Sequence, residues 1–423
     1  MEHFKDIKPK LICIVEDESV GLKGYLVIDS LVNNSSCGGI RLHKKLSVDE
    51  LKGLAYGMTL KYAFNSMPQG GAKAGIVTDI DMAVEEKQLL LNRFAEIIQP
   101  YMKSGFYHPG PDLGISQENI SIMRNHIGIK TNRQSKGKGY LSGYNTALAV
   151  MIGIEAACDF LQIKLPNSTI AVEGFGSVGT SLATLLFARG VKVISISTSK
   201  GALYDSNGLN IPELCELAKK HGDMVVEIYD KAEKISKKQL LELDVDILSP
   251  CAMSNTINNS NVQNIKAQII CPGSNNPITE KTELYLYKAG KVVIPDFTVN
   301  GGGVMGNKIE ITGIDKHYIE NFMRNTIKYR LIEILKISAV KNKVPSFYAK
   351  KYSLQQHKLM QSDNRKITIK GIIYKIAYTV FMSGIVPNFI LKRLAPFYFN
   401  CSLKRKIDRS WKKYMNYVQI ELE

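Results

Sequence analysis

The 423-residue sequence lacks the features that mark secreted or membrane-spanning chains. Its seven cysteines form no CxxC pair and no repeated spacing, and their odd number argues against a complete disulfide framework. The first residues, MEHFKDIKPKLICIVEDE, contain no apolar core of signal-peptide length. Residues 376–391 carry no charge, but they are fewer than the ~20 residues that span a bilayer. These absences favour a reducing compartment, and we expect the cytoplasm.

Acidic residues are scarce at the C-terminal end of the chain. Residues 311–423 contain 22 Lys and Arg against 7 Asp and Glu, a net charge of +15, whereas residues 1–310 carry only +1. The basic residues of the last stretch are interleaved with aromatic ones such as Phe397, Tyr398 and Trp411. Such a segment could bind nucleic acid or an anionic membrane surface. We favour the alternative, a solvated helical appendage that packs on the rest of the chain or on a neighbouring subunit.

Length and composition predict a soluble globular protein of two domains plus an extension. The chain exceeds one typical domain, and 45% of its residues are hydrophobic while 22% are charged.

Two lysines dominate the N-terminal part. Lys61 ends the segment MTLK, and Lys73 lies in the small-residue run GGAKAG of residues 70–75. Glycine lets another molecule approach the backbone closely, and a lysine in a poorly solvated pocket loses its proton more readily. One lysine could hold a carboxylate while the other works as a base. A glycine-rich loop with solvated lysines is the alternative.

Local patterns predict the elements around these lysines. Residues 11–28 alternate as a hairpin, and Ser47 to Glu50 resembles a capping box that opens a helix ending near Lys61. Residues 83–103 have helical spacing. The loop 107–114 then places Asp112 between two prolines and two glycines, which could fix its carboxylate or simply make a turn.

The second half begins with a dinucleotide-binding pattern. A helix over 144–161 precedes a buried strand over 168–173, which leads directly into the GFGSVG run of residues 174–179. A helix over 181–188 and a second strand over 191–197 complete a strand–helix–strand unit, the context that this glycine motif requires. The helix N-terminus would then bind a pyrophosphate.

The adenosine end of this site departs from the usual pattern. The run ISTSK at residues 196–200 contains no acid for the ribose hydroxyls, and Lys200 could meet a 2′-phosphate instead. NAD and NADP both stay open. Further strands near 246–248, 268–270 and 292–294 end in polar loops, which we expect to line the cofactor crevice.

Seven ordered segments resemble the glutamate/leucine/phenylalanine/valine dehydrogenase family, over residues 11 to about 310. They are the run 38–41 (GGIR), the MTLK and GGAKAGI segments, the loop 110–114 (GPDLG), Thr146, Asn275 and Asn300. The short N-terminal part is similar to the leucine dehydrogenase-like group. The resemblance implies an α/β fold, with an N-terminal α/β substrate domain and a C-terminal Rossmann domain. It also implies a homo-oligomer.

The resemblance further implies reversible oxidative deamination of an L-amino acid to a 2-oxo acid and ammonia. Lys73 would activate a water molecule, Asp112 would move protons at the substrate nitrogen, and Lys61 would bind the α-carboxylate. The implied substrate-binding residues also include Gly39, Asn300 and Asn307. The implied cofactor-binding residues are Thr146, Gly174, Phe175, Gly176, Ser177, Val178, Gly179, Thr198, Cys251, Ala252, Asn275 and Asn300, and no metal is expected.

Several positions depart from the family pattern. Cys37 stands where glutamate-specific members have a lysine, and Asn307 where they have a serine, so an apolar or uncharged substrate side chain is slightly favoured over glutamate. Ala147 and Ala149 replace two glycines near the nicotinamide. A catalytically impaired dinucleotide-binding regulatory protein with a basic partner-binding C-terminal region is the rival hypothesis from another class. A different Rossmann oxidoreductase would leave the two-lysine segment unexplained.

We therefore predict three regions. Residues 1–142 form a substrate and dimerisation domain, residues 143–345 a Rossmann domain with a returning helix, and residues 346–423 a basic, helical extension.

Overall fold

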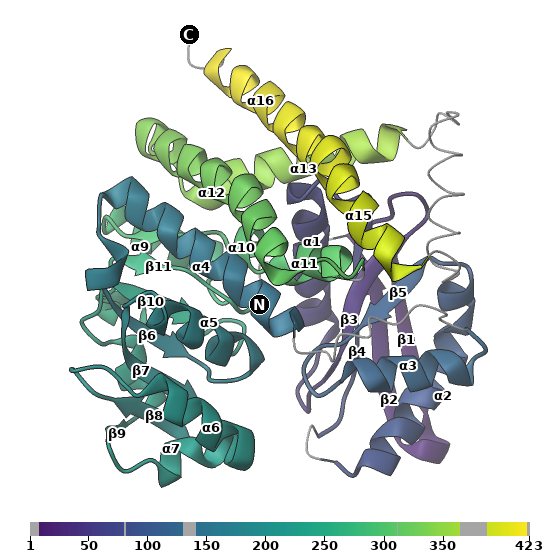
Figure 1. Ribbon diagram of the computed structural model, residues 1–423. Coiled ribbons are helices and arrows are strands. Elements are labelled where there is room, and N and C mark those ends of the chain that lie inside the picture. The colour runs from purple at the N-terminus through teal and green to yellow at the C-terminus, as the bar shows by residue number, and fades with distance from the viewer. Residues whose placement is uncertain (1–7, 80–81, 130–140, 311, 364–386, 421–423) are drawn as a thin grey trace. The chain divides into compact units, whose positions relative to one another are not determined.

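The computed structural model describes residues 8–79, 82–129, 141–310, 312–363 and 387–420 (Figure 1). They divide into two compact units. Unit 1 takes its described residues from 1–139, 311–313 and 353–403, and unit 2 takes the rest. The chain therefore returns to unit 1 after its first pass through unit 2, and its last helix belongs to unit 2 again.

Unit 1 is built on a five-stranded sheet with the order β1-β2-β4-β3-β5. The predicted hairpin is present, because β1 pairs antiparallel with β2. The glycine-rich run around Lys73 is a strand rather than a loop. It is the middle strand β4, and all of its residues are buried. The strands are β1 (Leu11–Asp17), β2 (Leu22–Ile28), β3 (Ser36–Leu42), β4 (Gly70–Ile76) and β5 (Tyr107–Gly110).

Glycines in β4 let a helix lie directly on this sheet. A Cβ on Gly71 would come within 2.2 Å of the Ala55 carbonyl oxygen and of the Thr59 amide nitrogen. Helix α1 therefore packs on β4. The helices of this part are α1 (Val48–Phe64), α2 (Val84–Lys103) and α3 (Gln117–His126), with a short 3-10 turn η2 (Glu18–Val20) inside the hairpin.

Unit 2 contains a seven-stranded sheet with the order β12-β11-β10-β6-β7-β8-β9. The strands from β12 to β7 are parallel, and β8 and β9 continue the edge antiparallel. This is the predicted doubly wound arrangement. The strands are β6 (Thr169–Glu173), β7 (Lys192–Thr198), β8 (Gly201–Tyr204), β9 (Glu233–Ile235), β10 (Ile247–Pro250), β11 (Ile269–Ile270) and β12 (Val292–Val293).

A long apolar helix, α4 (Leu141–Leu161), packs against α5, α11 and α12 of unit 2. Within the described residues its stretch Gly143–Leu161 is long and apolar enough to cross a bilayer, but 67% of it is buried. We interpret it as a core helix. The other helices of this region are α5 (Ser177–Phe187), α6 (Ile211–His221), α7 (Val225–Ile228), α8 (Lys237–Leu241), α9 (Glu280–Lys288), α10 (Asp296–Val299), α11 (Gly302–Glu310) and α12 (Lys316–Lys341), with 3-10 turns η3 (Leu165–Asn167), η4 (Gly222–Met224) and η5 (Val262–Asn264).

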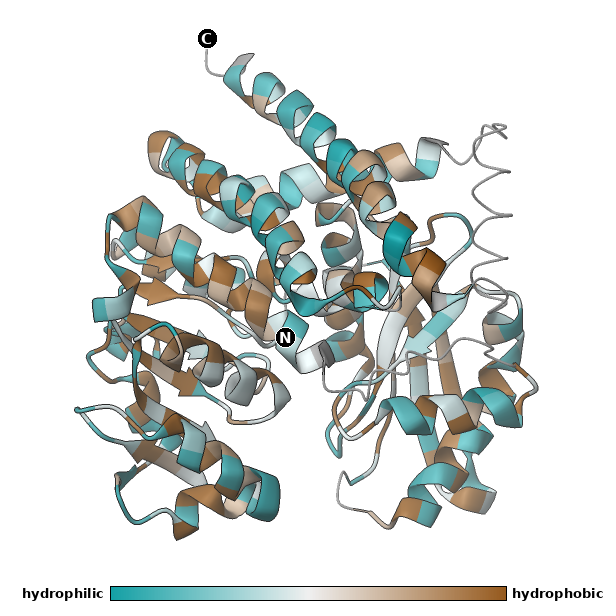
Figure 2. Ribbon diagram, in the orientation of Figure 1, coloured by the Kyte–Doolittle hydropathy of each residue, from teal (hydrophilic) through white to brown (hydrophobic). Residues whose placement is uncertain are grey.

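The C-terminal region is helical where it is described. It contains α13 (Pro345–Asp363), α15 (Asn388–Tyr398), a π-helical turn η6 (Phe399–Lys404) and α16 (Arg405–Ile420). Most of the uncharged stretch 376–391 lies outside the described residues. Helix α16 is mostly hydrophilic in Figure 2, but it buries Ile407, Trp411, Tyr414 and Val418 on one side.

Helix α16 packs on its own unit through aromatic and polar contacts. The Trp411 ring lies edge-on to Tyr352 with centroids 4.8 Å apart, and its indole nitrogen donates to Glu333 of α12. The Tyr329 hydroxyl of α12 donates to Asp408 at 2.8 Å. These contacts agree with the appendage that packs on the rest of the chain.

Candidate active site

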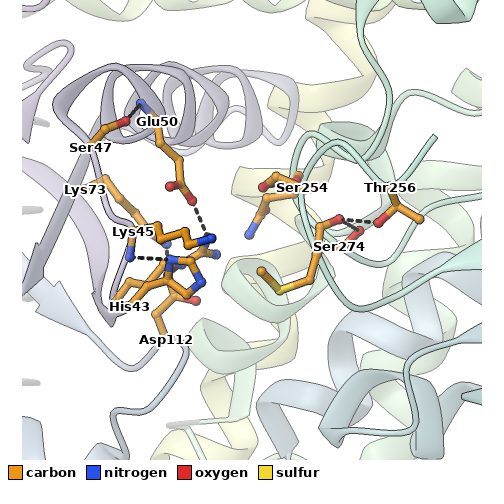
Figure 3. Close-up of polar contacts among 12 residues, drawn as sticks. His43, Lys45, Ser47, Glu50, Lys73, Asp112, Ser254, Thr256 and Ser274 are labelled. Atoms are coloured by element: carbon orange, nitrogen blue, oxygen red, sulfur yellow. Dashed lines mark hydrogen bonds and ion pairs between the residues drawn. The ribbon is translucent and has the colours of Figure 1, made fainter. Parts of the chain in front are cut away.

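In unit 1 the structure brings Lys73 and Asp112 into direct contact. The Lys73 ammonium of β4 forms an ion pair with Oδ2 of Asp112, which lies just after β5 (Figure 3). The side chain of Lys73 is 5% exposed and that of Asp112 is 16% exposed. Sequence separates these residues by 39 positions, and the pairing of β3 with both β4 and β5 joins them.

The two glycines of β3 make this close approach possible. A Cβ on Gly38 would overlap the Ala72 carbonyl oxygen at 1.6 Å. A Cβ on Gly39 would come within 2.8 Å of Asp112 Cβ. Gly39 therefore borders the Asp112 side chain, and any larger residue at either position would push β3 away from its neighbours.

Burial and charge shift both ionisable groups. Burial, aided by the Arg41 cation, lowers the pKa of Lys73 more than the neighbouring carboxylates raise it. Burial alone would raise the pKa of Asp112, but Lys73, Arg41 and hydrogen bonds together hold it well below its usual range. Before any substrate binds, the site thus combines an ionised carboxylate with an amine that loses its proton more easily than a solvated lysine.

Lys61 lies on α1, which packs on β4. It is 7% exposed, three residues before the helix ends at Phe64. Two residues earlier, the Thr59 hydroxyl accepts the Gly71 amide at 3.2 Å and donates to Asp29 at 2.5 Å. This network ties the MTLK segment to the strand that carries Lys73.

The glycine motif of unit 2 forms the turn between β6 and α5. Gly174 has φ +97°, a conformation that favours glycine, and its amide donates to the Ser197 hydroxyl at 2.9 Å. A Cβ on Gly179 would overlap the Gly174 carbonyl oxygen at 1.7 Å, whereas a Cβ on Gly176 would meet nothing within 4 Å. Gly176 caps α5 without a side-chain hydrogen bond, so the amides of the first turn, including Ser177 and Val178, are not capped by a side chain. This cradle fits a dinucleotide pyrophosphate.

Three loops gather at the carboxyl ends of the parallel strands of unit 2. A Cβ on Gly174 would come within 3.0 Å of the Ala252 amide nitrogen. The Ser274 hydroxyl lies 3.1 Å from the Pro250 carbonyl and 3.3 Å from that of Met253, and the Thr256 hydroxyl donates to the same Met253 oxygen at 3.0 Å (Figure 3). The loop with Cys251 and Ala252 is thereby joined to the loop that follows β11.

Asn300 joins the third loop to these two. Its amide nitrogen lies 2.8 Å from the Ser274 carbonyl and 3.3 Å from Asn275 Oδ1. Its own Oδ1 is buried and has no hydrogen-bond partner among the described residues, which leaves an acceptor for a ligand.

Thr146 and the two departures near it lie on α4. Thr146 is half-buried, and Ala147 and Ala149 are fully buried. Ala149 lies so close to α11 that a Cβ on Gly302 would be 2.4 Å from its methyl group. The added methyl group is thus accommodated by a glycine of α11.

Asn145, directly before Thr146, was missed by sequence reasoning. It is 1% exposed, and neither amide atom has a partner among the described residues. A polar residue inside an apolar helical run was the available signal.

Asp223 is the second residue that sequence reasoning missed. Its Oδ2 accepts the Ser199 amide at 3.2 Å, and its carbonyl accepts the Thr198 hydroxyl at 2.8 Å. The fold therefore places a carboxylate from η4 beside the end of β7, 25 positions after Thr198. No local pattern reveals it, because only the fold returns η4 to the end of β7.

Asn307 is exposed on α11, and Cys37 is half-buried in β3. Cys37 lies beside the buried Tyr62, which it contacts through its thiol. Burial, with Cys37 as a smaller cause, raises the pKa of Tyr62 well above its ordinary value. Tyr62 beside Cys37 is thus neutral.

A buried Lys–Asp pair on one sheet and a dinucleotide cradle on a doubly wound sheet define an NAD(P)-dependent dehydrogenase. The chain belongs to the Glu/Leu/Phe/Val dehydrogenase family. Residues 140–366 match the family model described as Glutamate/Leucine/Phenylalanine/Valine dehydrogenase, and residues 11–128 match its dimerisation domain. It is an oxidoreductase that acts on the CH–NH2 group of amino acids, and the predicted family and fold class are confirmed.

Curated relatives and solved structures agree with this assignment. The chain is 34% identical over 320 residues to the glutamate dehydrogenase of Thermotoga maritima, covering 70% of this chain and 76% of that protein. It is 32% identical over 280 residues to the NAD-specific glutamate dehydrogenase of Staphylococcus aureus, covering 63% and 66%.

Two solved structures share the fold. The hetero-hexameric glutamate dehydrogenase from Thermus thermophilus has a TM-score of 0.73 at 20% identity, covering 85% of this chain and 91% of that one. The L-tryptophan dehydrogenase from Nostoc punctiforme has a TM-score of 0.59 at 20% identity, covering 85% and 98%.

Proposed function

We propose that this protein catalyses the reversible, NAD-dependent oxidative deamination of an L-amino acid with an uncharged side chain. The observation that carries the proposal is the buried contact of Lys73 with Asp112, because it pairs an easily deprotonated amine with a fixed carboxylate. In this proposal the bound nicotinamide supplies the acceptor for the hydride that leaves the substrate Cα.

The chain's own residues supply positioning and proton transfer. Neutral Lys73 takes a proton from the water that attacks the oxidised carbon, and Asp112 moves protons at the substrate nitrogen. Lys61 holds the α-carboxylate as a cation, and Gly39 keeps the backbone of β3 close to Asp112. The cofactor is bound by the turn 174–179, by Thr146 and Thr198, and by the three loops that carry Cys251, Ala252, Asn275 and Asn300.

The surroundings of Cys37 support an uncharged substrate side chain. A thiol beside the buried Tyr62 offers no cation to a second carboxylate. An isolated carboxylate in such a place would lose its hydration without a charge partner, which is unfavourable. Asn307 provides an amide in place of a hydroxyl. Glutamate is the second candidate, because both curated relatives are named as glutamate dehydrogenases.

Asp223 supports NAD over NADP. Its carboxylate binds the first amide after β7, the position from which an acid meets the adenosine ribose hydroxyls in dinucleotide-binding folds. A 2′-phosphate at this place would face a like charge. Lys200, which directly follows Ser199, is exposed. It is the residue that would favour NADP.

The deciding experiment follows NAD(P)H absorbance with a panel of L-amino acids and both cofactors. We expect turnover with leucine, valine or phenylalanine exceeding that with glutamate, and a loss of at least about 100-fold in kcat for Lys73→Ala. Lys52 of α1, which pairs with Asp49 at 2.9 Å, provides the matched control as Lys52→Ala. Glutamate as the best substrate would overturn the side-chain assignment, and no turnover with any amino acid would favour the regulatory hypothesis.

The family match supports the expected assembly, and the compartment stays an expectation from the sequence. Because residues 11–128 match a dimerisation domain, we expect a homo-oligomer, which light scattering of the purified chain would detect. The cytoplasm stays the expected compartment.

Binding of nucleic acid or an anionic membrane by the C-terminal region stays the less favoured alternative to the packed helical appendage. The exposed side of α16 carries Arg405, Lys406, Arg409, Lys412 and Lys413. A gel shift and a vesicle sedimentation assay, each with the double variant Lys412→Glu/Lys413→Glu as control, test it. Binding that falls with salt and with the charge reversal would support it, and the absence of binding in both assays would end it.

A further inference from the structure

Arg41 links the Lys73–Asp112 pair to a second acid. It lies near the end of β3, and it is 8% exposed. Its Nε donates to Asp112 Oδ2 at 3.3 Å, and its Nη1 donates to Glu50 Oε1 at 3.1 Å. Oδ2 of Asp112 is therefore shared by two cations, Lys73 and Arg41.

The local fold fixes the backbone of Arg41 and also the Glu50 side chain that its guanidinium binds. On the backbone side, Arg41 is in register with Gly75 of β4, and a Cβ on Gly75 would come within 2.9 Å of the Arg41 carbonyl oxygen. On the other side, Glu50 lies in the first turn of α1, where its amide donates to the Ser47 hydroxyl at 3.2 Å. The expected capping box is only half formed. The Ser47 hydroxyl accepts the Glu50 amide (Figure 3), but the Glu50 carboxylate accepts from Arg41 instead of the helix N-terminus.

The four groups form an alternating row of charges, Lys73, Asp112, Arg41 and Glu50. Their formal charges cancel, and each neighbour in the row has the opposite sign. Tyr107 of β5 also acts on Asp112, and its hydroxyl donates to the Gly38 carbonyl at 3.0 Å. Burial, more than Cys37 or Asp112, raises the pKa of Tyr107 well above its ordinary value, so Tyr107 stays neutral.

We propose that Arg41, held in place by Glu50, is a positioning residue that fixes the Asp112 carboxylate against Lys73. This inference rests on the proposed function, which gives Lys73 and Asp112 their roles. A planar guanidinium with two occupied donors fixes an orientation that a single ammonium cannot, because each donor points in its own direction. Without it, Asp112 would keep only one of its two cationic partners.

Arg41 and Glu50 act on Lys73 in opposite directions. The Arg41 cation lowers the pKa of Lys73, and the Glu50 carboxylate raises it. Turnover that needs neutral Lys73 rises with pH through that pKa. Arg41→Gln therefore moves the rising limb of the pH profile to higher pH, and Glu50→Gln moves it to lower pH. A charge a few ångströms away in a partly buried site gives a shift on the order of one pH unit.

The test is the pH profile of kcat/KM for the full-length chain with its best amino acid. For Arg41→Gln we expect a roughly 10- to 100-fold loss that falls mainly on kcat, with the limb shifted to higher pH. Arg41→Lys keeps the charge but loses the two fixed donors that bind Asp112 and Glu50. The rising limb of its pH profile should therefore stay near that of the wild type while kcat falls. Free guanidinium should partly restore Arg41→Gln.

Arg93 on α2 provides the matched control, because it also bridges two acids, Asp17 at 2.5 Å and Glu96 at 2.8 Å. Arg93→Gln should leave the profile unchanged. If Arg41→Gln fails to fold, two other variants carry the test: Glu50→Gln should move the limb to lower pH, and Arg41→Lys should leave the limb near that of the wild type while kcat falls. The proposal is overturned if the rising limb of the pH profile is the same in Arg41→Gln and wild type. It is also overturned if the limb moves in the same direction in Arg41→Gln and Glu50→Gln.

A second readout separates this inference from the proposed function. Acetylation of Lys73 by acetic anhydride at a series of pH values, followed by peptide mass spectrometry, reports the neutral fraction of that amine without turnover. The same opposite shifts in the two variants support the role of Arg41 even for a chain that turns over no amino acid, and equal labelling curves refute it. A wild type without turnover would count against the proposed function alone.

Discussion

Replacing Asp223 with serine should shift cofactor selectivity from NAD toward NADP. Asp223 presents its carboxylate at the first amide after β7, with Oδ2 3.2 Å from the Ser199 nitrogen. In the proposed function this carboxylate accepts from the ribose hydroxyls of NAD and repels a 2′-phosphate. Serine keeps a small polar group there and removes the charge.

The size of the effect follows from exposure. Two unit charges about 4 Å apart interact by about 1 kcal/mol in water and about 4 kcal/mol near a protein surface. Asp223 is exposed, so a value of about 1–2 kcal/mol is appropriate. Loss of a charge-assisted hydrogen bond to the ribose weakens NAD by a further ~1.5 kcal/mol. Together these predict a change of roughly 100-fold in the ratio of kcat/KM for NAD to that for NADP.

Steady-state kinetics with both cofactors at one ionic strength measure this ratio. Asp230→Ser serves as the control, because Asp230 is an exposed acid of the same unit that lies outside η4. A ratio that Asp223→Ser leaves unchanged, or changes no more than Asp230→Ser does, would refute the assignment of Asp223 to the adenosine ribose.

Three further predictions concern substrate, pH and the C-terminal helix. Cys37→Lys combined with Asn307→Ser should raise kcat/KM for glutamate by at least about 10-fold relative to leucine, because a cation then meets the second carboxylate; equal ratios in an amino-acid panel would contradict this. Burial raises the pKa of Glu283 to about 7, so the folded chain holds a proton that the unfolded chain has released above about pH 4.5. The contribution of this proton to folding stability is full below pH 4.5 and is lost as pH rises to 7. Glu283→Gln should therefore stabilise the chain by about 3 kcal/mol at pH 8 but little at pH 4.5. Urea unfolding at both pH values measures this difference. Trp411 is the single tryptophan, so Tyr352→Ala should red-shift its fluorescence and cost about 3 kcal/mol in urea unfolding, and an unchanged emission maximum would show that α16 does not depend on this ring.

Sequence patterns predicted the elements whose causes are local. Ser47 begins α1 because its hydroxyl accepts the Glu50 amide, a contact that spans three residues. The strand–turn–helix around residues 174–179 follows from glycine conformations within a few residues, including the φ of +97° at Gly174. Helix α2 could be predicted from the spacing of its apolar residues alone. The family motifs could be recognised for the same reason, because each is a short run with its own local requirement.

Strand pairing could not be read from those runs. The segment around Lys73 has the composition of a flexible loop, but it is the fully buried centre of a five-stranded sheet. Its glycines are needed because helix α1 and strand β3 press against it, and neither contact is visible in a stretch of seven residues. The sequence therefore indicated that the backbone here is closely approached, but it did not show whether the segment is a loop or a strand.

The contacts that could be predicted from the sequence are those between residues within one turn or one strand of each other. The tertiary structure alone decided which distant groups meet, because parallel strands joined by helices place residues tens of positions apart at one edge. It joined Asp112 to Lys73 and Arg41, and it returned Asp223 to the end of β7. Charge acts through space, so the electrostatics of this site depend on these long-range contacts.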